Sequence, residues 1–445
     1  MREEAIFSLI DLALAKGAEA AEVYRLEQAS SLVDIKEGKI DSLSQAQQTG
    51  VGLRVLEQER MGFAFASDIG VESWEILADK ALAAARQSHP DPFLYFPPPP
   101  ASPYPEVDRY DSQLRAMGLA ERVDFAREME EAARGFDPRV SKVRHCLYQD
   151  SNYSVYISNS RGLKAGGQGT YCSCSVEVAA DEKGSSETGW DMQSSPFFSD
   201  LQGEEVGRRA AEQAVMMLGA KSLPTLRVDV VFSSPTAAEF LEVLSSALMA
   251  DAVQKQKSLF ANQVGTQVAS KTLTLVDDGL LPRGSHSFPF DDEGNPAQRT
   301  LLIEDGTLKG FLYDSYCAVK GGRQSTGNAH RAGFQSPPQI MATNLYAIPG
   351  NRPRERMIQD LSQGILVLSL MGMHTANPIS GDFSVGAEGL WVEKGRLKHP
   401  FRGVMIAGNI RNWLQSLAEV GSDLRFFGRH GSASLRVNGL QLVGV

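Results

Sequence analysis

Side chains that could do chemistry are spread thinly along this sequence. It has seven histidines, and none is followed by glutamate or lies within six residues of another. An H-E-x-x-H zinc helix is therefore absent. The sequence also has no G-x-S-x-G nucleophile elbow, no P-loop lysine and no G-x-G-x-x-G turn after a strand. Spacing alone supports no zinc, nucleophile or nucleotide site, although a site assembled from distant residues stays open.

Two polar segments are candidates for binding. Residues 319–350 surround Arg323, His330 and Arg331 with glycines and polar side chains. Guanidinium forks and backbone N–H groups there could hold the carbonyls or the carboxylate of a peptide. The alternative is a long surface loop. In the second segment, 377–395, Asp382 leads straight into a strand, and a tight turn is the alternative.

A helix is the clearest prediction for residues 233–253, where Glu242 lies inside the most apolar run. Ser234 can cap this helix, and Pro235 suits its first turn. At about 100° per residue, Glu239, Glu242 and Ser246 share one stripe. Apolar side chains occupy most of the other side: Phe240, Val243, Leu244, Ala247 and Leu248. A solvated or interface stripe is expected, and a catalytic Glu242 is the alternative.

Length and charge limit the classes of protein to consider. The 445 residues are enough for two or three domains, and the composition is that of a globular protein. A net charge of −10 argues against a general nucleic-acid binder. There is no apolar run of 18 residues, so no membrane span is expected. Acidic residues near Met1 argue against a signal peptide, and we expect a cytoplasmic protein.

The four cysteines predict reduced thiols rather than a disulfide framework, because they are few for such a long chain. Cys172 and Cys174 are two residues apart in an alternating, strand-like segment, so both should face one side of a sheet. A C-x-C metal site is possible in principle. A buried pair of small apolar side chains is the expected arrangement.

Helical and strand-like patterns follow one another twice in the first half of the chain. Helices are expected at 2–16, 71–87, 118–134 and 203–218. Strands are expected at 21–27, 31–37, 49–56, 60–66, 139–148, 153–159 and 168–180. A proline-rich connector, 91–107, separates the two sets. The order helix–strands–helix thus appears twice, as in an internal duplication.

The second half is richer in strand patterns. Hairpins are expected around Asp305-Gly306, Lys394-Gly395 and Asn438-Gly439. Helices are expected near 235–254, 352–363 and 409–419. We therefore predict an α+β fold, with a two-layer α/β domain at 1–220 followed by a β-rich domain at 221–445.

Six segments carry a resemblance to a known family. They are 50–68, 258–279, 302–314, STGNAHR at 325–331, NLYAIPG at 344–350 and SGDFSVGAEGLWVEKG at 380–395. Together they are similar to the TldD/PmbA family, once called modulators of DNA gyrase, and within it to the PmbA (TldE) branch. The similarity runs over nearly the whole chain, with these segments in the family's order.

The family also contains TldD-like subunits, which resemble zinc metallopeptidases with an H-E-x-x-x-H helix and a late cysteine ligand. The resemblance places Leu241 and Ser246 at the two histidine positions and Glu242 at the glutamate position. The last cysteine, Cys317, lies far upstream of the family's ligand. Leucine cannot bind zinc, and serine alone is a poor ligand. The resemblance therefore implies that this chain binds no zinc and that Glu242 is a remnant of the motif.

The resemblance further implies a subunit that pairs with a zinc-binding, TldD-like catalytic chain, or with itself, around a cleft for unfolded peptides. Those peptides would be degraded or matured, and neither nucleic acid nor a membrane is an expected partner. A self-sufficient hydrolase with an unrecognised site and a homodimeric scaffold are the alternatives. The shared motifs suggest these peptide-binding residues: Arg323, Thr326, Asn328, His330, Arg331, Asn344 and Asp382.

Overall fold

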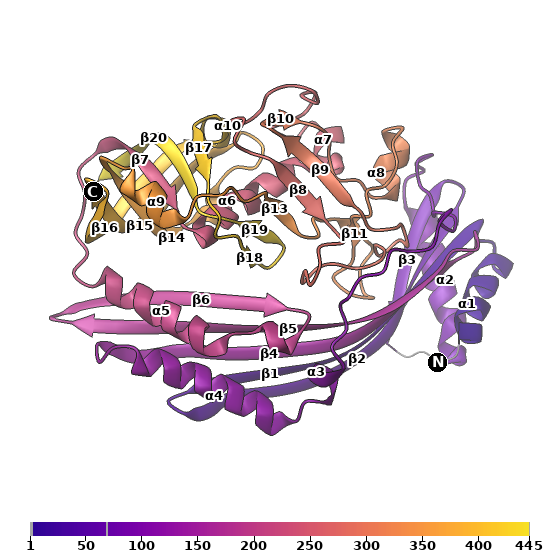
Figure 1. Cartoon of the computed structure of the whole chain (residues 1–445). Helices are drawn as coiled ribbons and strands as arrows, with labels where there is room; N and C mark the ends of the chain where they lie inside the picture. Colours follow the sequence, from indigo (N-terminus) through magenta and orange to yellow (C-terminus); the bar gives the residue numbers. More distant parts are fainter. Residues whose placement is uncertain (1–2, 68–69, 445) are drawn as a thin grey trace.

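The computed structural model describes residues 3–67 and 70–444 and has an α+β fold (Figure 1). An antiparallel half-barrel sheet with helices forms the N-terminal half, and a β-rich region follows it. In Figure 1 the long, curved sheet lies beneath the C-terminal region. No helix in the described ranges is long and apolar enough to cross a membrane.

Six strands form the N-terminal sheet in the order β3-β2-β1-β4-β5-β6. Their bounds are β1 Ala20–Lys36, β2 Lys39–Glu57, β3 Arg60–Ala66, β4 Val140–Asn159, β5 Lys164–Glu182 and β6 Ser185–Ser195. The helices of this half are α1 Glu3–Ala15, α2 Val71–Gln87, α3 Ser112–Ala116, α4 Leu119–Gly135 and α5 Gly203–Met217, with the short helix η1 at Phe198–Asp200. α2 packs on β2 and β3, whereas α5 packs on β5 and β6.

The strands are longer than the sequence predicts. The expected strands 21–27 and 31–37 form the single strand β1, and 139–148 and 153–159 form β4. The polar residues that suggested breaks stay in register because β1 pairs with β2 on one side and with β4 on the other. β6 was not predicted, since its sequence is mostly polar.

The order helix, three strands, helix occurs twice, and the two halves share a packing detail. In β3, a Cβ at Gly62 would lie 1.9 Å from the Ala81 carbonyl oxygen of α2. In β6, a Cβ at Gly189 would lie 2.0 Å from the Ala210 carbonyl oxygen of α5. Each half thus uses glycine to bring its last helix against its last strand. A common origin of the halves remains a prediction.

A five-stranded barrel forms part of the C-terminal region. Its strands follow the order β16-β15-β14-β7-β20, and pairing of β16 with β20 closes it, while β17 extends the β20 edge. The bounds are β7 Leu226–Phe232, β14 Gln363–Met371, β15 Asp382–Glu393, β16 Arg396–Asn409, β17 Leu417–Val420 and β20 Leu435–Gly444. The expected hairpin at Asn438-Gly439 is wrong, because β20 runs through it with only a register shift between Val437 and Leu440.

A second sheet lies beside the barrel in the order β10-β9-β8-β13-β19-β18. Its strands and the β11–β12 pair are β8 Leu275–Asp278, β9 Arg299–Glu304, β10 Thr307–Leu308, β11 Ala329–His330, β12 Gln339–Ile340, β13 Leu345–Ala347, β18 Arg425–Phe427 and β19 His430–Ser432. The helices are α6 Ser234–Ala247, α7 Ala250–Gln254, α8 Ser315–Lys320, α9 Arg354–Gln359 and α10 Ile410–Gln415, with η2 at Met373–Thr375. The expected helix 235–254 is therefore divided, because Met249 bridges to Leu312 between α6 and α7.

A buried ionic cluster joins the sheet to the C-terminal region. Arg54 of β2 donates to both oxygens of Glu22 of β1 at 2.8 Å and to Glu293 at 3.0 Å. Arg331 donates to Glu22 at 2.7 Å. The connector 91–107 has no helix or strand and covers this junction, with the Arg54 guanidinium 5.1 Å from the centre of the buried Phe96 ring.

Candidate functional site

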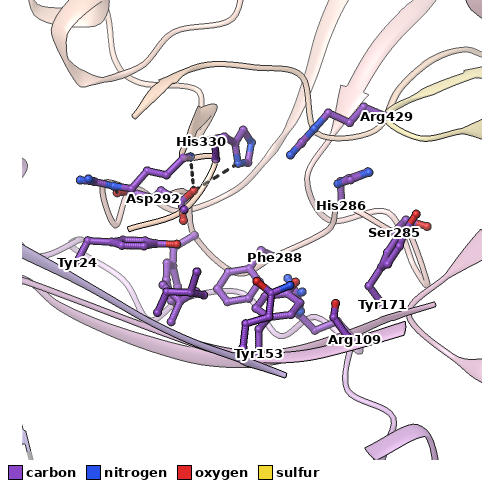
Figure 2. A pocket seen from close by; sticks show the side chains of 18 residues that line it. Tyr24, Arg109, Tyr153, Tyr171, Ser285, His286, Phe288, Asp292, His330 and Arg429 are labelled. Atoms are coloured by element: carbon purple, nitrogen blue, oxygen red, sulfur yellow. Dashed lines mark hydrogen bonds and ion pairs between the residues drawn. The ribbon is translucent and has the colours of Figure 1, made fainter. Parts of the chain in front are cut away.

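A cavity of about 340 Å³ lies between the sheet and loops of the C-terminal region (Figure 2). Strands β1, β4 and β5 form one side, and residues 285–292, 330–333 and 429 form the other. Such a volume suits a small organic group or one end of a peptide. The lining residues are Tyr24, Leu26, Gln28, Arg109, Ser151, Tyr153, Val155, Tyr171, Ser285, His286, Phe288, Phe290, Asp292, His330, Arg331, Ala332, Gly333 and Arg429.

Aromatic rings and a stacked arginine form the side of the cavity near the sheet. Phe288 stacks with Tyr153 at a centroid distance of 6.4 Å. The Arg109 guanidinium lies 3.9 Å from the Phe288 centroid and donates to the Ser287 carbonyl at 2.6 Å. Burial lowers the pKa of Arg109 to about 9, which still leaves the guanidinium charged at neutral pH. This wall therefore combines apolar surface with a buried positive charge.

A second arginine enters from the opposite side, between two imidazoles. Figure 2 shows the Arg429 side chain extending between His286 and His330. Burial and the Arg429 charge lower the pKa of His286 to about 3 and hold the pKa of His330 well below its usual value. Both rings are therefore neutral at pH 7. The His330 Nε2 atom is buried and has no hydrogen-bond partner among the described residues.

Asp292 is the carboxylate of the cavity lining. It accepts a hydrogen bond from the Arg331 backbone N–H at 2.7 Å and another from the Tyr24 hydroxyl. Its Oδ2 lies 4.0 Å from His330 Nδ1. Burial raises the pKa of Asp292, whereas its bond to Arg331 opposes this change. The carboxylate thus already has partners of its own.

Of the residues that the shared motifs suggested, His330 and Arg331 line this cavity. The Arg331 side chain is fully buried, and its nitrogens donate to Asp292 O, Ser336 O and Glu22. Its guanidinium also stacks over the Tyr24 ring at 4.7 Å. Arg331 therefore fixes the loop onto the sheet, whereas His330 presents an imidazole to the cavity.

Thr326, Asn328 and Asn344 lie in buried or half-buried hydrogen-bond networks outside the cavity lining. Asn328 donates to Asp277 at 2.7 Å and accepts from Thr326 at 2.6 Å. Asn344 donates to the Asp278 carbonyl at 2.7 Å. These bonds fix the loops that carry His330 and His286.

The other two suggested residues lie elsewhere. Arg323 is exposed and lines a separate cavity of about 400 Å³ between the connector prolines and α8. Asp382 is exposed at the start of β15, where it accepts from Ser380 at 2.7 Å and from Asn409 at 2.8 Å. The structure thus places the suggested residues in four different neighbourhoods.

Helix α6 carries the positions at which the family resemblance places a metal motif. Leu241 is buried in the hydrophobic core, whereas Glu242 and Ser246 are exposed. The Ser246 hydroxyl donates to the Val243 carbonyl at 2.8 Å. Cys317 is buried in α8. In the described part of the chain, no group of three His, Cys, Asp or Glu side chains could hold a metal ion. These residues do not fit a zinc site.

Glu239, one turn before Glu242, gives α6 a pH-dependent stability. Burial and the Glu242 charge raise the pKa of Glu239 to about 7 from 4.5. The folded protein keeps this proton up to about pH 7, whereas the unfolded chain releases it near pH 4.5. Between pH 4.5 and pH 7 the unfolded chain is therefore increasingly favoured, because its Glu239 ionises while the folded one stays protonated. The free energy of unfolding falls over this range, and the full loss is present above pH 7.

We expect Glu239→Gln to raise the free energy of unfolding by on the order of 1 kcal/mol at pH 8 and to change it little at pH 4.5. Urea denaturation at the two pH values measures this difference. Glu128→Gln, at an exposed position of α4, is the matched control. The same pH profile in both variants would contradict the assignment.

Sequence reasoning missed Arg109, His286, Asp292 and Arg429 as members of one site. They come from the segment between the connector and α3, from the loop between β8 and β9, and from the β18–β19 turn. Arg429 stands next to a histidine in a glycine-rich turn, which was the only local signal. Nothing in the sequence spacing shows that these segments meet.

Comparison with known proteins gives matches along most of the chain. Models of one family match as PmbA/TldA metallopeptidase domain 1 at residues 21–85, central domain at 112–218 and C-terminal domain at 225–444. The metalloprotease PmbA of Escherichia coli O157:H7 is 29% identical, with 95% of this chain and 91% of that protein covered. A metalloprotease TldD homolog of Haemophilus influenzae is 28% identical, with 94% and 88% covered.

Solved structures agree with this similarity. A Thermotoga maritima protein described as a candidate modulator of a DNA gyrase superposes with a TM-score of 0.91 at 28% identity, covering 99% of this chain and 100% of its own. TldE from Thermococcus kodakarensis has a TM-score of 0.90 at 22% identity, with 99% and 100% covered, and at that identity it supports the fold alone.

Proposed function

Because the chain belongs to the PmbA/TldD metallopeptidase family, we propose that it is a PmbA-like subunit that supports a zinc peptidase without catalysing hydrolysis itself. The partner would be a TldD-like chain that binds the zinc. The pair would accept unfolded peptides for degradation or maturation. The cavity between the sheet and the C-terminal region would accommodate part of such a peptide.

The state of α6 is the observation that supports this proposal most directly. A peptidase glutamate acts on a water that a metal activates, so it needs metal ligands beside it. Leu241 is buried and has no donor atom, and the Ser246 hydroxyl bonds within its own helix. The Glu242 carbonyl accepts from Ser245 Oγ at 2.8 Å, whereas its carboxylate is on an exposed helix face and has no metal-ligand group beside it in the described part of the chain. Relatives named PmbA and TldD are 29% and 28% identical to this chain, so the family includes proteins of both names.

We expect the purified, zinc-supplemented chain to leave an unstructured peptide intact and a mixture with a TldD-like partner to cleave it. The two chains should also co-elute in size-exclusion chromatography. Glu242→Gln should change the cleavage rate of the mixture less than twofold, because this carboxylate has no metal beside it. Mass spectrometry of the peptide over time measures the rate.

The matched control is the glutamate-to-glutamine change in the partner's own H-E-x-x-x-H motif, which should abolish cleavage. Cleavage by this chain alone that persists through further purification and is lost in Glu242→Gln would contradict the proposal. A stable homodimer that neither binds the partner nor affects its cleavage would favour a scaffold instead.

A further inference from the structure

The cavity holds two buried arginines that have no carboxylate partner among the described residues. Arg109 bonds to the Ser287 carbonyl, and Arg429 bonds to the Ala342 carbonyl at 2.8 Å. The carboxylates whose charges reach them are Asp292 and Asp277. Asp292 bonds to Arg331 N and Tyr24, while Asp277 bonds to Asn328 and Thr343. A buried guanidinium without an anion is costly, so an open cavity beside two of them favours an anionic ligand.

The histidines of the cavity do not supply that negative charge, nor do they add positive charge. Their rings lie against Arg429, and burial keeps them in the neutral form. A neutral imidazole can donate one hydrogen bond to an anion without a change in its own charge. The unpartnered Nε2 of His330 is a second polar group at this cavity. Arg429 and His330 therefore form one polar end of the site.

Another part of the cavity lining is aromatic and aliphatic, although the lining also includes polar residues such as Gln28, Ser151 and Ser285. Phe288 and Phe290 pack edge to face at 4.8 Å, and Tyr153, Val155 and Leu26 extend this surface along the sheet. Aromatic surface beside a cation suits a ligand with a hydrocarbon body and a charged end. A dianion such as phosphate is less well matched, because Asp292 adds negative charge to the same small cavity.

We propose that this cavity binds a carboxylate carried on an aromatic or large aliphatic group. The carboxylate lies at Arg429, between His286 and His330, and the hydrocarbon body lies against Phe288 and Tyr153. Two sources share this chemistry: the C-terminal residue of a peptide and a free aromatic acid. The site lies within one chain, so its occupancy does not depend on the subunit role proposed above.

The first test uses the wild-type chain without a partner. Isothermal titration with N-acetylphenylalanine is expected to show binding that is at least tenfold tighter than that of N-acetylphenylalaninamide. A charge-assisted hydrogen bond accounts for a ratio of this size.

An octapeptide that ends in phenylalanine, as free acid and as amide, gives the second pair of ligands. Tighter binding of the peptide acid than of the small acid identifies peptide ends as the source, and the reverse order identifies a free acid.

The second test removes the cation. Arg429→Gln is expected to weaken binding of the preferred acid at least tenfold, Arg429→Lys less, and Arg208→Gln not at all, since Arg208 is exposed on α5 and outside the cavity lining. Equal binding of acid and amide, no binding at millimolar ligand, or tighter binding of inorganic phosphate overturns the proposal. If Arg429→Gln does not fold, the comparison of acid and amide on the wild-type chain still decides.

Discussion

Replacement of Arg54 by methionine is expected to lower the free energy of unfolding by about 3–5 kcal/mol. The Arg54 side chain is 6% exposed and makes two parallel bonds to Glu22 and a third bond to Glu293. Both glutamate side chains are also buried. Methionine would fill much of the volume but leave two buried carboxylates with fewer partners. An uncompensated buried charge is what makes the loss of one member of an ion pair so costly.

The position of Arg54 makes this effect more than a local one. Glu22 and Arg54 belong to neighbouring strands of the N-terminal sheet, whereas Glu293 and Arg331 belong to C-terminal loops that border the cavity. Loss of Arg54 should therefore loosen the contact between the two regions as well as the sheet itself. It should also weaken the binding of any ligand in the cavity.

Urea unfolding followed by tryptophan fluorescence measures the loss, since Trp74 and Trp413 are buried in the N-terminal and C-terminal regions. Arg86→Met is the matched control, because Arg86 forms an exposed pair with Glu57 on the same half. Its midpoint should stay at the wild-type value. Equal midpoints for the two variants would show that the buried cluster does not hold the regions together.

Local patterns predicted those elements whose stability is mainly local. The helix expected at 71–87 has the same bounds as α2. Its apolar residues recur at helical spacing, and that apolar side is the one buried in the core. The strand breaks expected within β1 and β4 were wrong, since pairing on both sides outweighs polar composition. The Asn438-Gly439 pair forms an irregularity inside β20 because β7 pairs with β20 on both sides of it, while β17 pairs before it and β16 after it.

The cavity was predicted only in part, for a related reason. The sequence predicts His330 as a binding residue because a glycine-rich, polar segment surrounds it. Arg109 and Arg429 are 320 residues apart in sequence and become part of one site only when the sheet and the β18–β19 turn approach each other. The ionic cluster of Arg54 and Glu22 has the same character. No pattern along the chain separates such residues from ordinary surface charges.

Replacement of Gly62 by alanine, and separately of Gly189, is expected to lower the free energy of unfolding by about 3 kcal/mol in each case. The new Cβ would lie 1.9 Å from Ala81 O at position 62 and 2.0 Å from Ala210 O at position 189. In both places the clash is with helix backbone, which cannot rotate away as a side chain could. The helix would have to move off the strand and give up part of its apolar contact.

Gly135→Ala is the matched control, since a Cβ at this last residue of α4 meets nothing within 4 Å. It should leave stability unchanged or raise it by about 0.5–1 kcal/mol, because alanine is the better helix former. Urea unfolding of the three variants gives the comparison, followed by tryptophan fluorescence, since α2 carries Trp74 and Trp190 follows Gly189 in β6. Losses that agree within about 1 kcal/mol would mean that the two halves use the same close helix-on-strand packing. A large loss at one position and none at the other would show that their similarity ends at the order of elements.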